Sequence, residues 1–132
     1  MHAPHQVPKG WADAYKGKFD SGWDAYRDQV FKRQKDLGTM PQNAVLSRHD
    51  PDVQDWNQLS AEEHKLYARM MEVFAGFFEH TDHHIGRMIN FLRDIGELDN
   101  TLVMVISDNG ASAEGGPTGS TDHLALYPHL RD

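Results

Sequence analysis

The chain has 132 residues, enough for one small domain with a modest hydrophobic core. Its net charge of −7 argues against a nucleic-acid partner, because the phosphates would repel it. Its lack of cysteine excludes a disulfide, a thiolate nucleophile and a thiolate metal ligand. No apolar stretch approaches the roughly 18 residues that a bilayer-spanning helix needs, so we expect no membrane span.

The N-terminal half predicts two helices separated and flanked by loops. Residues 1–10 contain prolines and a glycine and predict an extended loop. Residues 11–19 predict a short helix. Residues 21–37 predict a second helix that stops at Gly38. Residues 39–59 are polar, contain prolines and predict an irregular surface segment.

A long amphipathic helix is expected next. Ser60 and Glu63 have the spacing of a capping box, in which each side chain bonds to the backbone N–H of the other residue. An apolar stripe at helical spacing then predicts a helix that ends at Gly96, with Gly76 or Thr81 as the candidate position of a kink. The stripe comprises Leu66, Met70, Val73, Phe74, Phe77, Ile85, Met88, Leu92 and Ile95.

The apolar run from Thr101 to Ile106 predicts a strand. It shows no alternation with polar residues, which is typical of a strand buried on both faces of a parallel sheet. A long helix, a short turn and such a strand form half of an α/β repeat. The expected fold class is therefore α/β, with a mostly helical chain and one clear buried strand.

Asp108 and Asn109 follow this strand, where open α/β sheets bind their ligands. A carboxylate and an amide oxygen suit a hard divalent cation. Gly110 permits the bend that would direct both side chains at one ion. The alternative interpretation is an ordinary Asx turn, because Asp-Asn-Gly is a common turn sequence.

The combination of motifs resembles the type I sulfatases, especially the bacterial arylsulfatases. SDNGA follows an apolar strand after a helix ending in GELDNT, and the head of the chain reads HAPHQVP. The stretches KGKFD and FKRQKDLG also follow the family's course. We expect residues 1–120 to be an internal segment of a sulfatase catalytic domain and residues 121–132 to be a tail that does not match the family.

This resemblance implies an α/β sandwich akin to alkaline phosphatase and hydrolysis of small-molecule sulfate esters. The family uses a formylglycine nucleophile and a calcium ion, Ca²⁺. By resemblance, Asp108 and Asn109 would supply half of the calcium site. His5 best matches the family's A-P-H histidine, which assists the departing oxygen, and His2 is the weaker candidate for this catalytic role. The alternative for both histidines is a loop-shaping role beside the prolines.

The chain also departs from the family pattern. It has no cysteine and no S-x-P-x-R motif, so the formylglycine lies outside it. The family's paired N-terminal aspartates and its later lysine segment are also missing. We therefore expect a fragment of a longer enzyme that is inactive alone, of undetermined oligomeric state. Its compartment stays open, with the bacterial cytoplasm or periplasm as candidates for the intact enzyme.

Two alternatives to a sulfatase remain. One is a phosphate or phosphonate ester hydrolase of the same superfamily, which would use zinc or manganese. The other is a non-enzymatic helical module that binds zinc or nickel through His80 and His84, with His83 beside them at i, i+3 and i+4 spacing. The plainer interpretation of these three histidines is a partly exposed polar face of the helix.

Overall fold

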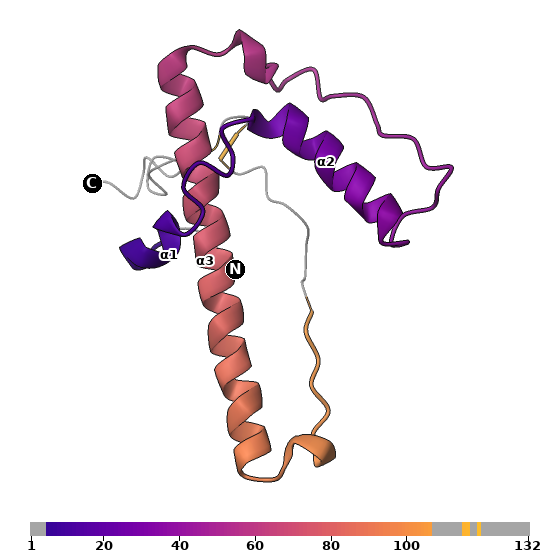
Figure 1. The fold of residues 1–132 in the computed structure, drawn as a ribbon, viewed down its shortest axis with the longest axis vertical. Helices are drawn as coiled ribbons and strands as arrows, with labels where there is room; N and C mark the ends of the chain where they lie inside the picture. Colours follow the sequence, from indigo (N-terminus) through magenta and orange to yellow (C-terminus); the bar gives the residue numbers. More distant parts are fainter. Residues whose placement is uncertain (1–4, 107–114, 117–118, 120–132) are drawn as a thin grey trace, which may run out of the picture.

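The computed structural model describes residues 5–106, 115–116 and 119, and its regular elements are all helices (Figure 1). In chain order they are α1 (Lys9–Asp13), α2 (Gly22–Asp36), the 3₁₀ helix η1 (Trp56–Gln58), α3 (Ala61–Asp94) and the 3₁₀ helix η2 (Leu98–Asn100). The mostly helical character that we expected from the sequence is confirmed for these residues.

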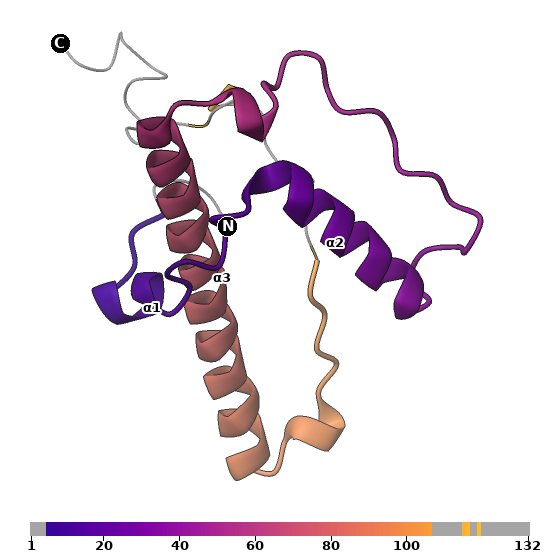
Figure 2. The same cartoon turned by 45° about the horizontal axis from the view of Figure 1, so that its top comes forward.

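Helix α3 is the axis of the molecule, and the other described elements are arranged around it (Figure 2). The capping box at its start is confirmed: the Glu63 N–H donates to Ser60 Oγ at 3.3 Å, and the Ser60 N–H donates to Glu63 Oε2 at 2.8 Å. The helix is continuous over 34 residues, including Gly76 and Thr81, the two candidate positions of a kink. It ends at Asp94, two residues before the expected Gly96.

The two N-terminal helices differ in how well the sequence predicted them. Helix α2 lies within the expected range of residues 21–37, with Ser21 as its N-cap residue. Helix α1 begins two residues before the expected range of residues 11–19, within the expected loop, and it is shorter because residues 14–21 form successive turns rather than helix. In these turns the Gly17 N–H donates to Glu72 Oε1 on α3 at 2.7 Å, a tertiary contact that replaces a helical hydrogen bond.

The core lies where the first half of α3 meets the turns after α1, the start of α2 and η1. Four buried side chains form it: Phe19, Trp56, Leu59 and Ala68. Trp23 packs edge-on against Trp56, with ring centroids 4.9 Å apart. Gly22 also lies directly against the Trp56 ring: its φ of +79° is in the left-handed region, and a Cβ there would lie 2.2 Å from the ring.

The expectation of a buried strand over Thr101–Ile106 is wrong for this structure. The segment is extended, but no strand occurs among the described residues, and Leu102 and Ile106 are 82% and 90% exposed. In Figures 1 and 2 it runs antiparallel to α3, and no other extended segment among the described residues lies beside it. A strand forms only when another chain segment satisfies its backbone hydrogen bonds, and the described part of the chain provides none.

The apolar stripe on α3 is also largely uncovered beyond the core. Of its members, Met88 and Ile95 are each more than half exposed, and Leu66 is 45% exposed. An apolar stripe on a helix normally packs against another element, and the described part of the chain contains no sheet that could cover this one. Among the described residues, no helix combines the length and the apolar character that crossing a membrane requires.

Candidate functional site

His5, the candidate catalytic histidine, lies against the middle of α3. Its ring centroid is 5.1 Å from that of Phe74, in an edge-on arrangement, and 5.2 Å from that of Phe77. The side chain is half-buried, so one side of the imidazole packs on these aromatic rings. Such packing restricts the rotation of the side chain, and a role in proton transfer would require this restricted orientation.

Helix α1 follows this loop and is held tightly to α3. Gly76 makes the close approach possible, because a Cβ at this position would lie 2.4 Å from the carbonyl oxygen of Trp11. The Trp11 ring in turn packs on His80 and His83, with centroids 5.3 Å apart in both pairs. The contacts of Trp11 therefore fix the loop that carries His5 to α3, six residues after His5.

A charged network secures the same junction. Arg69 donates to Asp13 Oδ1 and to Glu72 Oε2, both at 2.8 Å, and so joins α1 to α3. The hydrogen bond to Glu72 is the main reason why the pKa of Arg69 is raised above its ordinary value. The pKa of Asp13 is lowered, first by the hydrogen bond that Lys9 donates to it. Glu72 is buried, so its two hydrogen-bond donors, Arg69 and the Gly17 N–H, compensate for the loss of water.

The histidines on α3 form a short hydrogen-bonded chain. Arg87 can only donate, so its contact at 3.0 Å makes Nδ1 of His84 an acceptor. Nε2 of His84 then carries a hydrogen and donates to Nε2 of His80, also at 3.0 Å. The pKa of His84 is lowered, first by partial removal from water and then by the neighbouring His80 and Arg87. This pair has the spacing of two ligands of one ion, but its contacts are also satisfied without one.

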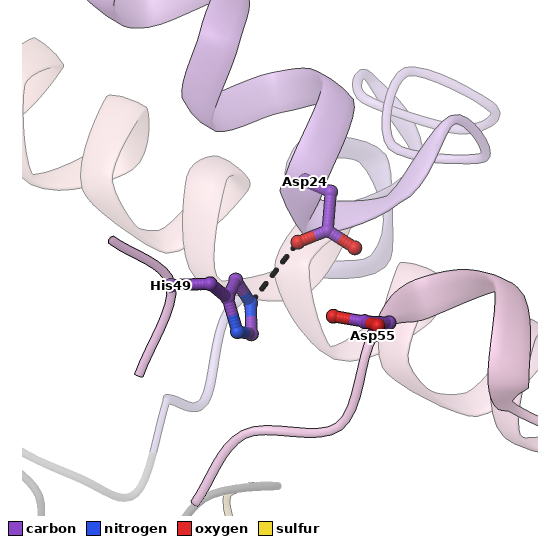
Figure 3. A group of neighbouring side chains, drawn as sticks. All are labelled: Asp24, His49 and Asp55. Atoms are coloured by element: carbon purple, nitrogen blue, oxygen red, sulfur yellow. Dashed lines mark ion pairs between the residues drawn. The ribbon is translucent and has the colours of Figure 1, made fainter. Parts of the chain in front are cut away.

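A second cluster was not predicted from the sequence. Asp24, His49 and Asp55 bring one ligand atom each to within 4.8 Å of the others (Figure 3). Nε2 of His49 lies 3.0 Å from Oδ1 of Asp24. Asp24 lies 25 positions before His49, and Asp55 lies six positions after it, and no sequence motif connects the three. Only the fold reveals this group.

The remaining candidates lie outside the described residues. These are His2, the second catalytic candidate, and the metal candidates Asp108 and Asn109. The structure therefore does not test whether these side chains approach His5, and their roles stay predictions. The structure also does not test the domain boundary that we expected after residue 120.

Comparison with known proteins gives consistent matches. Residues 1–129 match a family model described as sulfatase. The chain is 43% identical, over 131 residues, to an uncharacterized sulfatase of Schizosaccharomyces pombe; the match covers 98% of this chain and 23% of that protein. It is 32% identical, over 116 residues, to an arylsulfatase of Klebsiella aerogenes, covering 87% of this chain and 25% of the relative. The chain thus spans about a quarter of the length of these two relatives.

Proposed function

Because the chain belongs to the sulfatase family, we propose that it is a segment of a sulfuric ester hydrolase that acts on small-molecule sulfate esters. The observation that carries this proposal is the match of residues 1–129 to the family model. Family membership implies an alkaline-phosphatase-like fold for the whole enzyme. A relative named arylsulfatase favours sulfate esters over the phosphate or phosphonate esters of the alternative interpretation.

Within this segment, His5 is the residue that we propose assists the leaving group. Hydrolysis of a sulfate ester releases an alkoxide or phenoxide, and a nearby acid lowers the barrier by protonating that oxygen. The packing of His5 on Phe74 and Phe77 supports this role, because it restricts the orientation of the imidazole. His2 remains the second candidate for the same role.

Asp108 and Asn109 are proposed as half of a calcium site. The chemistry of this donor pair, one carboxylate and one amide oxygen, fits a hard cation. When bound, such a cation would withdraw charge from the sulfate oxygens. Asp108→Ala in an intact enzyme should lower both calcium content and turnover. An unchanged calcium content would contradict the assignment.

The nucleophile must come from a part of the enzyme other than these residues. The chain contains no cysteine and no S-x-P-x-R motif, from which the family's formylglycine is made. We therefore propose that the segment supplies the leaving-group histidine and two metal ligands, and that covalent attack on sulfur is made by a residue outside it.

The test is a leaving-group series in an intact sulfatase that contains this segment. His5→Ala should lower kcat more than it raises KM, which is typical of an interaction made mainly in the transition state. The loss should shrink for aryl sulfates whose phenols are strongly acidic, because those phenoxides leave without a proton. An equal loss for all phenols would indicate that His5 only positions the sulfate group. A larger loss in the matched variant His2→Ala would assign the role to His2.

A further inference from the structure

We propose that Asp24, His49 and Asp55 bind a divalent transition-metal ion of the zinc class. The three side chains come from separate parts of the chain: the first turn of α2, the irregular segment after it, and the residue directly before η1 (Figure 3). This inference goes beyond the proposed ester hydrolysis and does not rest on it.

The His49 ring is turned so that a lone pair faces Asp24. Nδ1 lies 3.0 Å from the backbone oxygen of Asp50, which can only accept, so Nδ1 carries a hydrogen. In the neutral ring Nε2 then has a lone pair, and it lies 3.0 Å from Oδ1 of the Asp24 carboxylate. Two electron-rich atoms at this distance need a cation between them, either a proton or a metal ion.

Asp55 favours the metal ion over the proton. It places a second carboxylate beside the same ring nitrogen, and a divalent ion can bind one oxygen of each carboxylate together with that nitrogen. The hydrogen bond from Nδ1 to a backbone oxygen is also the usual arrangement behind a histidine ligand, because it fixes the tautomer and the orientation of the ring.

The carboxylates are held by their surroundings as well. Oδ2 of Asp24 accepts from the Trp56 N–H at 2.8 Å, and the Trp56 side chain is buried in the core. Oδ2 of Asp55 accepts from Gln58 at 3.2 Å. Each carboxylate therefore has one oxygen occupied by a protein donor and its other oxygen still able to bind an ion. Such support from neighbouring groups reduces the reorganisation that binding requires.

The geometry and the ligand types indicate which ion fits. Two ligand atoms bound at about 2.1 Å to a tetrahedral Zn²⁺ lie about 3.4 Å apart, so Nε2 and Oδ1, which are 3.0 Å apart, need to separate by only a few tenths of an ångström to admit the ion. An imidazole nitrogen with two carboxylates suits Zn²⁺ and its neighbours in the first transition row, whereas Ca²⁺ prefers oxygen ligands alone. Asp24 is 38% exposed and His49 is 29% exposed, so water can complete the coordination.

A titration with Zn²⁺ tests the site. Because His80 and His84 also offer two nitrogens, the 132-residue chain is first changed to His80→Gln/His84→Gln, and Zn²⁺ binding is then measured by calorimetry. We expect one Zn²⁺ per chain. Adding His49→Gln or Asp55→Asn should weaken Zn²⁺ binding by ~100-fold or more. Even the substitution of a residue that only orients a metal ligand lowers metal affinity by about 10–100-fold.

Two measurements keep the result interpretable. Circular dichroism checks that each variant retains its helices, and Asp55→Asn changes an exposed side chain that does not contribute to the core. Zn²⁺ should also slow proteolysis within residues 39–55, since the ion would tie this segment to α2. Loss of all Zn²⁺ binding in the His80→Gln/His84→Gln chain, or equal binding with and without His49 and Asp55, would overturn the proposal.

Discussion

The imidazole of His84 is surrounded by groups that disfavour its positive charge. Partial removal from water contributes first, followed by His80, Arg87 and His83, and together they lower its pKa from the ordinary value of about 6.5. The folded chain therefore binds fewer protons here than the unfolded chain between the lowered pKa and 6.5. The effect of His84 on the free energy of unfolding is therefore most favourable above pH 6.5. This free energy decreases as the pH falls from 6.5 to the lowered pKa.

We predict that a chemical-shift titration will give His84 a pKa below 6.5. Arg87→Gln should raise this pKa, because it removes a positive charge whose donor lies 3.0 Å from Nδ1. Arg93→Gln is the matched control on the same helix, since Arg93 bonds to Asn90 and not to a histidine. A His84 pKa at or above 6.5, or an equal effect of the two arginine variants, would contradict the prediction.

The residues of the candidate sites differ in how far the sequence alone could identify them. His5 is found from a motif, because it lies in the contiguous segment HAPHQVP. The group of Asp24, His49 and Asp55 has no such signal, since irregular chain between residues 39 and 55 brings it together. Loop geometry depends on tertiary contacts such as the one from Trp56 to Asp24, and no periodicity in the sequence reports these contacts.

At the scale of elements, the junction between α1 and α3 depends on the absence of a side chain at Gly76. Gly76→Ala would place a Cβ 2.4 Å from the Trp11 oxygen and 2.7 Å from its carbonyl carbon. Both are backbone atoms, so α1 must move as a unit. We predict a loss of about 1–3 kcal/mol in the free energy of unfolding, as for other overpacked sites. Urea unfolding followed by tryptophan fluorescence measures it.

Gly86 provides the control for this experiment on the same helix. A Cβ at Gly86 meets no atom within 4 Å, so Gly86→Ala should only gain helix propensity and stabilise the chain by about 1 kcal/mol. The difference between the two alanine variants isolates the clash from the propensity. Equal stability of the two variants would show that α1 does not need its close approach to α3.

The elements that the sequence predicted well are those that local interactions define. The capping box at Ser60 and Glu63 and the extent of α2 depend on neighbours a few residues away, and both are confirmed. The strand expected over Thr101–Ile106 depends instead on pairing with distant segments. Its apolar composition predicts burial, but composition indicates only which residues can be buried, not whether a partner segment is present.

At the scale of the whole molecule, two exposed apolar surfaces lie on the described residues. One is the second half of α3, where Ile85, Met88 and Phe91 are 37%, 54% and 60% exposed, and the other is the extended segment 101–106. Surfaces of this kind usually contact other protein. The chain spans about a quarter of the length of the two relatives described above, so we expect other parts of a sulfatase fold to cover these surfaces.

The 132 residues alone should not hydrolyse sulfate esters. Covalent catalysis needs an activated nucleophile, and the sequence contains neither a cysteine nor the matching serine motif. Asp108 and Asn109 are also too few for a calcium site, because Ca²⁺ takes about six to eight ligands. The exposed segment 101–106, which pairs with no other described segment as a strand, should in addition promote association between chains.

The measurement is an assay of the purified chain on an aryl sulfate with Ca²⁺ present, alongside an intact sulfatase as the positive control. We expect no turnover above that of the buffer, and light scattering that rises with protein concentration. Turnover that persists through purification and disappears in His5→Ala would contradict the prediction, because it would require a nucleophile within these residues. Turnover that is unchanged in His5→Ala would indicate a contaminating enzyme, and the prediction would stand, since the chain itself would contribute nothing to the reaction.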